Sequence, residues 1–275
     1  MHSHPKKLYS PIGGIGMGSL GVSHVSSTQS AAAVGGLANV NSIAFDGTND
    51  YIDFGDADVF TPNASGGNRG FTMSYWVNPA ATGNQLIGSK RRFAAGAQRY
   101  EWRTMLNYQS KPLATFYGND NSGITQQLLL DTALSTSTWY HVAFTFDLAD
   151  ANTSIVGYIN GVKATHGSGG TYSSSGTWAA VGNTAAPMDW GRIANDYGEL
   201  SLDEISLFDD ALTEAQVQAI YNSGTPTDLS GESYLLGWWR MGDGDSHPTI
   251  TDQSSNSNDG TMTNMDSADI TTDVP

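Results

Sequence analysis

The pattern of apolar and polar positions between residues 139 and 163 alternates with a period of two. Its first part places large apolar residues on one side and smaller or polar ones on the other: Tyr140, Val142, Phe144 and Phe146 against His141, Ala143 and Thr145. Such alternation predicts a half-buried strand. A second apolar stretch ends in Asn160-Gly161, the dipeptide that best adopts the positive φ angles of a tight hairpin turn. The centre of the chain therefore predicts an antiparallel sheet.

Similar short patterns recur on both sides of this centre, with turn-forming residues between them. They cover residues 42–47, 49–55, 71–77, 85–90, 100–106, 113–117, 190–193 and 201–208. Many short strands at close intervals favour an all-β sandwich over alternating strand–helix units. One short helix is predicted after them, because Thr213 fits an N-cap, Gln216 completes a capping box, and Gly224 with Pro226 ends the pattern.

Composition supports a glycine-rich and aromatic-rich β protein with a large core. The 275 residues include 32 glycines, 7 tryptophans and 12 tyrosines, but no cysteine. The absence of cysteine excludes a disulfide framework and thiolate chemistry. The net charge of −15 argues against a nucleic-acid or anionic-membrane partner. No apolar run approaches the length of a membrane span.

Residues 1–40 are predicted to be an extended N-terminal arm. The segment is rich in glycine and serine, and too many glycines interrupt its apolar part for a good signal-peptide helix. A segment so poor in core-forming side chains is expected to be held by neighbouring subunits, which predicts an assembly. The arm is therefore a candidate contact for a homo-oligomer or for other proteins of a virion.

The ordered landmarks of residues 42–224 resemble the laminin G-like branch of the concanavalin A-like lectin/glucanase jelly rolls. They are residues 43–47 with 50–52, 71–77, 139–143, 158–161, and 202–205 leading to 211–213. The resemblance implies two packed antiparallel sheets over residues 41–225. It also implies a module of secreted, cell-surface or phage structural proteins.

Residues 226–275 depart from the order of that family. Residues 235–243 and 252–261 look like the segment that normally opens such a domain, but here they follow the last helix. Two arrangements are open: a circularly permuted domain in which this segment fills the first-strand position, or a strand that completes a neighbouring copy. We favour the first.

Catalytic signatures are missing from the sequence. Glucanases of this fold need paired carboxylates at fixed spacing, and none of the five glutamates lies in an alternating acidic run. Asp203 and Glu204 are adjacent, which predicts side chains on opposite faces of a strand. We therefore expect a protein that is not an enzyme.

Calcium is the one cofactor that the sequence suggests. Asp252, Asn256, Asn258 and Asp259 offer oxygen ligands within a few residues, and the resemblance implies that their loop lies near Asp203. The alternative interpretation is that these Asp and Asn residues only build a tight turn.

A basic cluster stands out in this acidic chain: Lys90, Arg91, Arg92, Arg99, Arg103 and Lys111. Such a run is usually a solvated face. The alternative is a contact with the acidic C-terminal residues of a neighbouring copy, which makes Arg91 and Arg92 candidate ligand or partner residues. Trp238 and Trp239 are further candidates, because two adjacent side chains on a strand point to opposite faces and one must leave the sheet interior.

Two functions fit these observations. The first is a non-enzymatic structural or adhesion protein of a larger assembly, a virion component with its jelly roll displayed on the virion surface. The second is a secreted, extracellular, calcium-dependent carbohydrate-binding module. A displayed jelly roll that binds a host glycan would combine the two.

Overall fold

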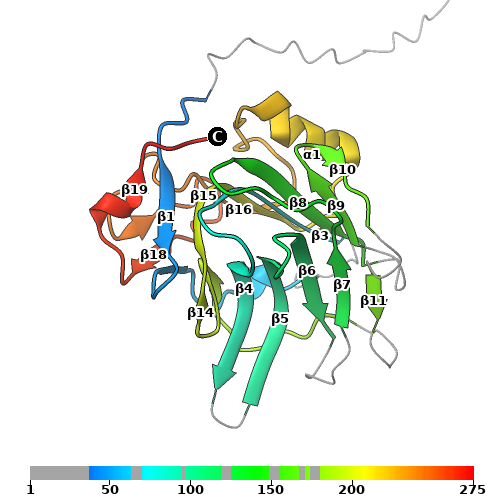
Figure 1. Cartoon of the computed structure of the whole chain (residues 1–275). Coiled ribbons are helices and arrows are strands. Elements are labelled where there is room, and N and C mark those ends of the chain that lie inside the picture. The colour runs from blue at the N-terminus through cyan, green and yellow to red at the C-terminus, as the bar shows by residue number, and fades with distance from the viewer. Residues whose placement is uncertain are drawn as a thin grey trace, which may run out of the picture. The chain divides into compact units, whose positions relative to one another are not determined.

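A computed structural model describes residues 37–62, 70–94, 97–118, 125–148, 155–166, 171–173 and 180–275 (Figure 1). The first 36 residues, and with them most of the predicted arm, lie outside the described residues. The described chain forms two large antiparallel sheets, one short α-helix and a two-stranded hairpin. The predicted sandwich is confirmed.

The first sheet contains eight of the described strands, in the order β10-β9-β8-β3-β15-β1-β19, with β16 also paired to β15. Their bounds are β1 Ser42–Asp46, β3 Phe71–Pro79, β8 Tyr140–Phe146, β9 Ile155–Ile159, β10 Val162–Lys163, β15 Glu199–Phe208, β16 Leu235–Trp239 and β19 Ile270–Thr271. Asn160 and Gly161 join β9 to β10 with φ angles of 50° and 72°, so the predicted turn is confirmed.

The second sheet contains nine described strands in the order β11-β7-β6-β5-β4-β12-β2-β18-β17. Their bounds are β2 Tyr51–Asp53, β4 Gln85–Ala94, β5 Ala97–Leu106, β6 Pro112–Tyr117, β7 Thr125–Leu129, β11 Thr171–Ser173, β12 Met188–Trp190, β17 Thr249–Ile250 and β18 Gly260–Thr263. A hairpin of β13 Arg192–Ile193 and β14 Asp196–Tyr197 accompanies this sheet. Short 3₁₀ turns occur at Asp58–Phe60, Asn222–Gly224 and Ser267–Asp269.

The main core lies between the two sheets and is rich in aromatic rings. Phe116 stacks on Phe146 with ring centroids 4.3 Å apart, which joins β6 of one sheet to β8 of the other. Trp239 of β16 lies 4.6 Å from Phe54 and 5.8 Å from Phe60, centroid to centroid. Aromatic side chains bury large areas, so the C-terminal segment supplies a substantial part of this core.

A second apolar layer covers the outer face of the eight-stranded sheet. The helix α1 (Glu214–Tyr221) begins at Thr213 with the predicted capping box, and it ends at Asn222, two residues before the predicted stop. Figure 1 shows α1 beside β9 and β10, and Val217 packs with Ala143 and Tyr158. The prediction that β8 is half-buried is therefore wrong, since all but Tyr140 of its seven residues are buried.

The C-terminal segment pairs with strands of the same chain in this structure. On one side of β15, β1 occupies the first half and β16 the second half: Ile43 is opposite Leu202, and Trp239 is opposite Ile205. Two segments from distant parts of the sequence thus share one strand position, and we call their meeting point the seam. Exchange of the segment with a neighbouring copy stays a prediction. No described helix is both long and apolar enough to cross a membrane.

Candidate functional site

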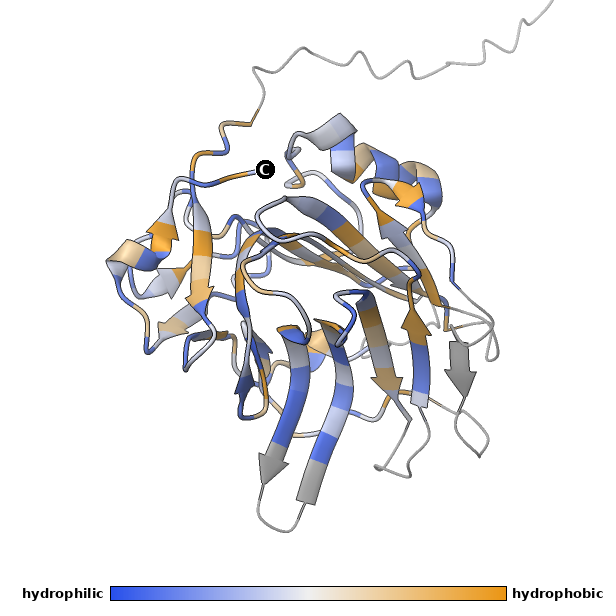
Figure 2. Cartoon of the chain, viewed as in Figure 1, coloured by the Kyte–Doolittle hydropathy of each residue, from blue (hydrophilic) through white to orange (hydrophobic). Residues whose placement is uncertain are grey.

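A row of polar side chains crosses the outer face of the nine-stranded sheet. Cross-strand pairing places the following residues side by side, from β2 to β7: Asp53, Asp189, Ser89, Arg103, Thr115 and Gln127. Their neighbours along the strands, such as Ile52 and Trp190, point the other way into the core. Figure 2 shows hydrophilic residues along β4 and β5, where this row crosses them.

The β13–β14 hairpin packs on the same outer face, and hollows lie between it and the sheet. Ile193 joins Met105 and Leu113 in a small apolar cluster on the sheet surface. This contact holds the hairpin against the sheet. It places Arg192 and Asn195 next to the polar row, where they line the hollows described next. Two hollows result, with volumes of about 670 and 370 Å³, in the range of small-molecule sites.

The two hollows adjoin, because Arg91 and Asn195 line both of them. We call them together the arginine groove. The larger hollow is lined by Gly47, Asn84, Leu86, Arg91, Arg103, Met105, Ile193, Asn195, Asp196 and Tyr197, and the smaller by Tyr51, Asp53, Arg91, Arg92, Pro187, Asp189, Arg192, Ala194 and Asn195. Four arginines thus face one groove of an acidic protein.

Neighbouring groups hold two of these arginines in place. Arg192 Nε donates to Asp189 Oδ2 at 3.0 Å, and its guanidinium carbon lies 3.3 Å from the centre of the Tyr51 ring. The guanidinium carbon of Arg91 lies 4.2 Å from the Tyr100 ring centre. Cation–π contacts of this kind orient a guanidinium group without neutralising its charge.

Asp189 is a buried acid in this groove. Burial raises its pKa to about 6, although the hydrogen bond from Arg192 opposes the shift. Its Oδ2 accepts from Arg192, while its Oδ1 has no hydrogen-bond partner among the described residues. The groove therefore combines fixed cations with an acid that titrates closer to neutrality than an ordinary aspartate.

The basic cluster predicted from the sequence divides in the structure. Arg91, Arg92 and Arg103 line the groove, and the role of Arg91 and Arg92 as ligand or partner contacts stays a prediction. Lys90 does not belong to a solvated face: it is fully buried, with Nζ 2.8 Å from both Asp56 Oδ1 and Glu101 Oε1. No sequence pattern pointed to Tyr51, Asp189 or Arg192, which reach the groove from other segments of the chain.

The tryptophan prediction is wrong about exposure. Trp238 does point away from the main core, but the second apolar layer covers it, and it is 3% exposed. Trp239 is fully buried in the main core. Neither side chain reaches the surface, because α1 and the chain around Leu229 cover the face that alternation alone would leave to solvent.

The predicted calcium ligands form a turn instead of an open cation site. Three backbone amides, those of Trp238, Ser254 and Asn258, donate to the Asp252 carboxylate. Asp259 accepts from the Asp252 amide, and the side-chain amides of Asn256 and Asn258 donate to carbonyls of β16. No group of three or more acidic or histidine side chains suited to a metal occurs within the described residues. The residues do not fit a calcium site.

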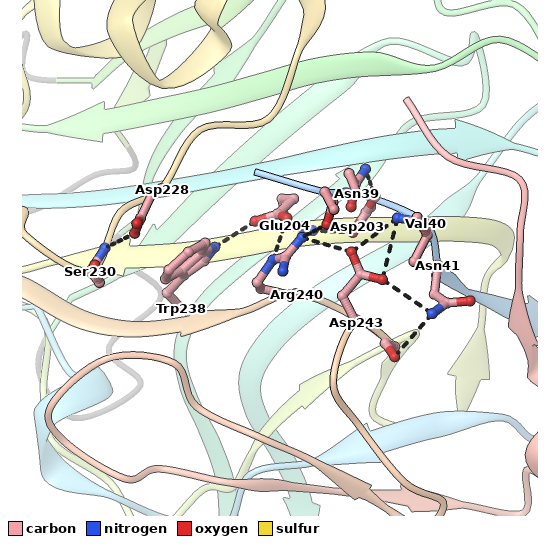
Figure 3. A network of polar contacts seen from close by, with 12 residues as sticks. Asn39, Val40, Asn41, Asp203, Glu204, Asp228, Ser230, Trp238, Arg240 and Asp243 are labelled. Atoms are coloured by element: carbon pink, nitrogen blue, oxygen red, sulfur yellow. Dashed lines mark hydrogen bonds and ion pairs between the residues drawn. The ribbon is translucent and has the colours of Figure 1, made fainter. Parts of the chain in front are cut away.

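Asp203 lies at the seam, in a separate polar network shown in Figure 3. The register between β15 and β3 shifts between Asp203 and Ser206, and Glu204 has a left-handed φ of 47°. This bulge breaks the alternation of the strand. The prediction that Asp203 and Glu204 point to opposite faces is therefore wrong, since both join the same outer network.

Arg240 is the centre of the seam network. Its Nε donates to Glu204 Oε1 at 3.0 Å, and its Nη2 donates to Asp243 Oδ2 at 2.7 Å and to the Ala38 carbonyl at 2.6 Å. Trp238 Nε1 donates to the second oxygen of Glu204 at 2.6 Å. The buried carboxylates of Glu204 and Asp243 are thus paired and hydrogen-bonded, as stable burial requires.

The base of the predicted arm also ends in this network. Asn39 Nδ2 donates to Asp203 Oδ2 at 2.8 Å, and the Val40 amide donates to Asp243 at 3.1 Å. Burial, together with the charge of Glu204, raises the pKa of Asp203 well above its usual range. Asn39 Oδ1 has no partner among the described residues, so a rotated Asn39 amide can accept a hydrogen bond from the protonated Asp203 carboxyl.

The comparisons with known proteins agree with this fold. Residues 46–218, which are 173 of the 275 residues, match the Laminin_G_3 family of the concanavalin A-like lectin/glucanases superfamily. The chain therefore belongs to this family, as the order of landmarks predicts. No curated protein matches the chain.

Solved structures resemble the chain at low sequence identity. A putative carbohydrate binding protein from Bacteroides ovatus has a TM-score of 0.53 and 18% identity, over 82% of this chain and 58% of that protein. A native heptameric SAP-like pentraxin from Limulus polyphemus has a TM-score of 0.47 and 16% identity, over 66% and 82% of the two chains. The Ruminococcus gnavus IT-sialidase CBM40, solved with α2,3 sialyllactose, has a TM-score of 0.49 and 15% identity, over 68% and 100%. At this identity, the likeness shows the fold alone.

A substitution of Asp203 tests the electrostatics of the seam. Because the folded-state pKa is raised, the folded chain takes up a proton that the unfolded chain lacks, and its stability falls as pH rises from about 4 through the folded-state pKa. Asp203→Asn cannot ionise, and its amide can donate to a rotated Asn39. We expect the variant to be more stable than the wild type at about pH 7, with the difference vanishing toward pH 4. Urea unfolding at several pH values measures it.

Asp228→Asn is the matched control. Hydrogen bonds from Ser230 lower the pKa of Asp228, which is exposed, so this substitution is expected to cost a little stability at neutral pH. A wild type more stable than Asp203→Asn by the same amount at every pH would contradict the account of a destabilised buried carboxyl.

Proposed function

We propose that this chain is a non-enzymatic adhesion module whose arginine groove binds a saccharide, and that it serves a larger assembly. The observation that carries the proposal is the groove itself. It combines about 670 and 370 Å³ of adjoining space with guanidinium, carboxylate, amide and phenol groups. Saccharides present many hydroxyl groups, and a hollow lined by donors and acceptors matches them.

A binding role fits the carboxylates of the chain better than a glycosidase role does. The adjacent acids Asp203 and Glu204 are 0% and 5% exposed, and both are engaged within the seam network. A glycosidase needs two carboxyl groups on either side of a substrate bond, with access for that substrate. Buried acids bound to Arg240 and Asn39 do not offer this access.

The assembly that we propose is a virion, with the sandwich displayed on its surface and the N-terminal arm among neighbouring subunits. The support comes from the composition of residues 1–36, which are rich in glycine, serine and alanine. The described base of the arm adds support, because Ala38, Asn39 and Val40 attach to Arg240, Asp203 and Asp243. A force on the arm would thus reach the folded sandwich directly.

Blocking the groove tests the binding function. Asn195 lines both hollows and is exposed, so Asn195→Trp is expected to fill the groove with little effect on folding. On an array of neutral and acidic glycans, we expect the full chain to bind a defined subset. For these glycans the variant should bind at least about tenfold more weakly, which corresponds to a loss of about 1.4 kcal/mol in binding free energy.

Ala219→Trp on the exposed side of α1 is the matched control, because it adds the same ring to the opposite face of the sandwich. It should leave binding unchanged. Equal binding by the two variants would place the ligand outside the groove, and no binding by any form of the chain would refute a saccharide-binding function.

The arm is tested by solution mass. The shortened chain should begin at Leu37, because removal of Ala38 to Asn41 would also break the seam network. We expect the full chain to form a defined oligomer and the shortened chain to be a monomer with an unchanged melting temperature, measured by light scattering and thermal unfolding. Monomers in both cases would remove the support for self-assembly through the arm.

A further inference from the structure

The distribution of positive charge along this chain is unusual for its net charge of −15. Of its seven arginines, four line the arginine groove: Arg91, Arg92, Arg103 and Arg192. Arg92 and Arg103 make no ion pair with any described residue. Neither guanidinium group thus has a described carboxylate at ion-pair distance, although Arg92 acts on Asp189 from farther away.

One strand pair carries a direct charge conflict. Arg92 on β4 lies opposite Arg99 on β5 in the strand register. Like charges placed directly across a strand pair are destabilising by a few tenths of a kcal/mol to about 1 kcal/mol. An anion beside Arg92 would relieve this repulsion, so the arrangement favours a bound negative group over an empty groove.

Contacts within the groove orient the guanidinium groups of Arg103 and Arg192 in a way that suits anion binding. Arg103 Nε donates to Thr115 Oγ1 at 3.4 Å, and its terminal nitrogens make no hydrogen bond with the described residues. Arg192 is fixed between Asp189 and the Tyr51 ring. A planar guanidinium group binds a carboxylate or sulfate through parallel hydrogen bonds, and prior orientation reduces the entropy lost on binding.

Carboxylates in the same groove limit the kind of anion. Asp53, Asp189 and Asp196 also line it. They would repel a densely charged chain such as a nucleic acid, and the net charge of the protein adds to this repulsion. Asp53 and Asp196, which are half-buried and exposed, can accept hydrogen bonds from hydroxyl groups, as Asn84 and Asn195 can. A ligand with separate negative charges and many hydroxyls matches both sets of groups.

We propose that the arginine groove selects acidic saccharides, in which a carboxylate or sulfate group binds near Arg92 in the smaller hollow or near Arg103 in the larger one, while sugar hydroxyls bind the accessible aspartate and asparagine side chains. This proposal rests on the proposed saccharide-binding function and specifies its ligand class. The two adjoining hollows offer space for more than one sugar unit.

The test uses the full chain and a glycan array built of matched pairs, in which each carboxylated or sulfated glycan stands beside its counterpart without the acidic group. We expect binding to the acidic members to exceed binding to their neutral counterparts by about tenfold or more, since a charge-assisted hydrogen bond contributes about that much. Carboxylated and sulfated arms identify which anion is preferred. Added salt should weaken the binding.

Three variants then assign the effect to the groove. Arg92→Gln and Arg103→Gln should each lower affinity for the acidic glycan about tenfold and affect neutral glycans little. Lys163→Gln removes the same charge from the exposed β10 strand and should leave affinity unchanged. Because Arg92→Gln also removes the repulsion with Arg99, its melting temperature should be equal to or above that of the wild type, which separates lost binding from misfolding.

Each outcome has a distinct meaning. Equal binding to acidic and neutral members of each pair would overturn the inference while leaving the saccharide-binding function in place. Equal loss of acidic-glycan affinity in Arg92→Gln and Lys163→Gln would reduce the effect to net charge and would also overturn it. If no glycan binds, the proposed function fails first.

Discussion

The structure depends on how one strand position of the eight-stranded sheet is filled. Along one side of β15, β1 and β16 each pair with one half of the strand, although more than 180 residues separate them in the sequence. The bulge at Asp203 and Glu204 lies where they meet, and Arg240 forms ion pairs there with Glu204 and Asp243. The strand β16 also places Trp239 in the main core. The same segment therefore fills half of the strand position beside β15 and completes the core.

The two outer faces of the sandwich have different roles as a result. The face over the eight-stranded sheet is occupied by α1, the apolar residues packed against it and the seam network. In the part of the chain that the structure describes, the small β13–β14 hairpin packs on the face of the nine-stranded sheet, beside its polar row. Surface chemistry is therefore concentrated on the second face, where four arginines gather in an otherwise acidic protein. The fold fixes where a ligand has access, and the arginines define what it should carry.

Sequence patterns predicted the local features well, because those features depend on a few neighbouring residues. The Asn160-Gly161 turn, the Thr213–Gln216 capping box and the position of strand β8, though not its burial, are of this kind. Predictions failed where a distant segment decides the outcome. Trp238 is covered by residues around α1, and Glu204 leaves the alternation because β1 and β16 meet beside it. In the sequence, the groove is indicated only by the basic run around Arg91, because Tyr51, Asp189 and Arg192 reach it from other strands.

The measurement that tests the central claim most directly is a crystal structure of the full chain with the acidic glycan that binds best. The account predicts the acidic group of that glycan within hydrogen-bonding distance of Arg92 or Arg103, with sugar hydroxyls toward Asp196 or Asn195. A glycan bound over α1, at the seam or at loops away from the nine-stranded sheet would contradict it.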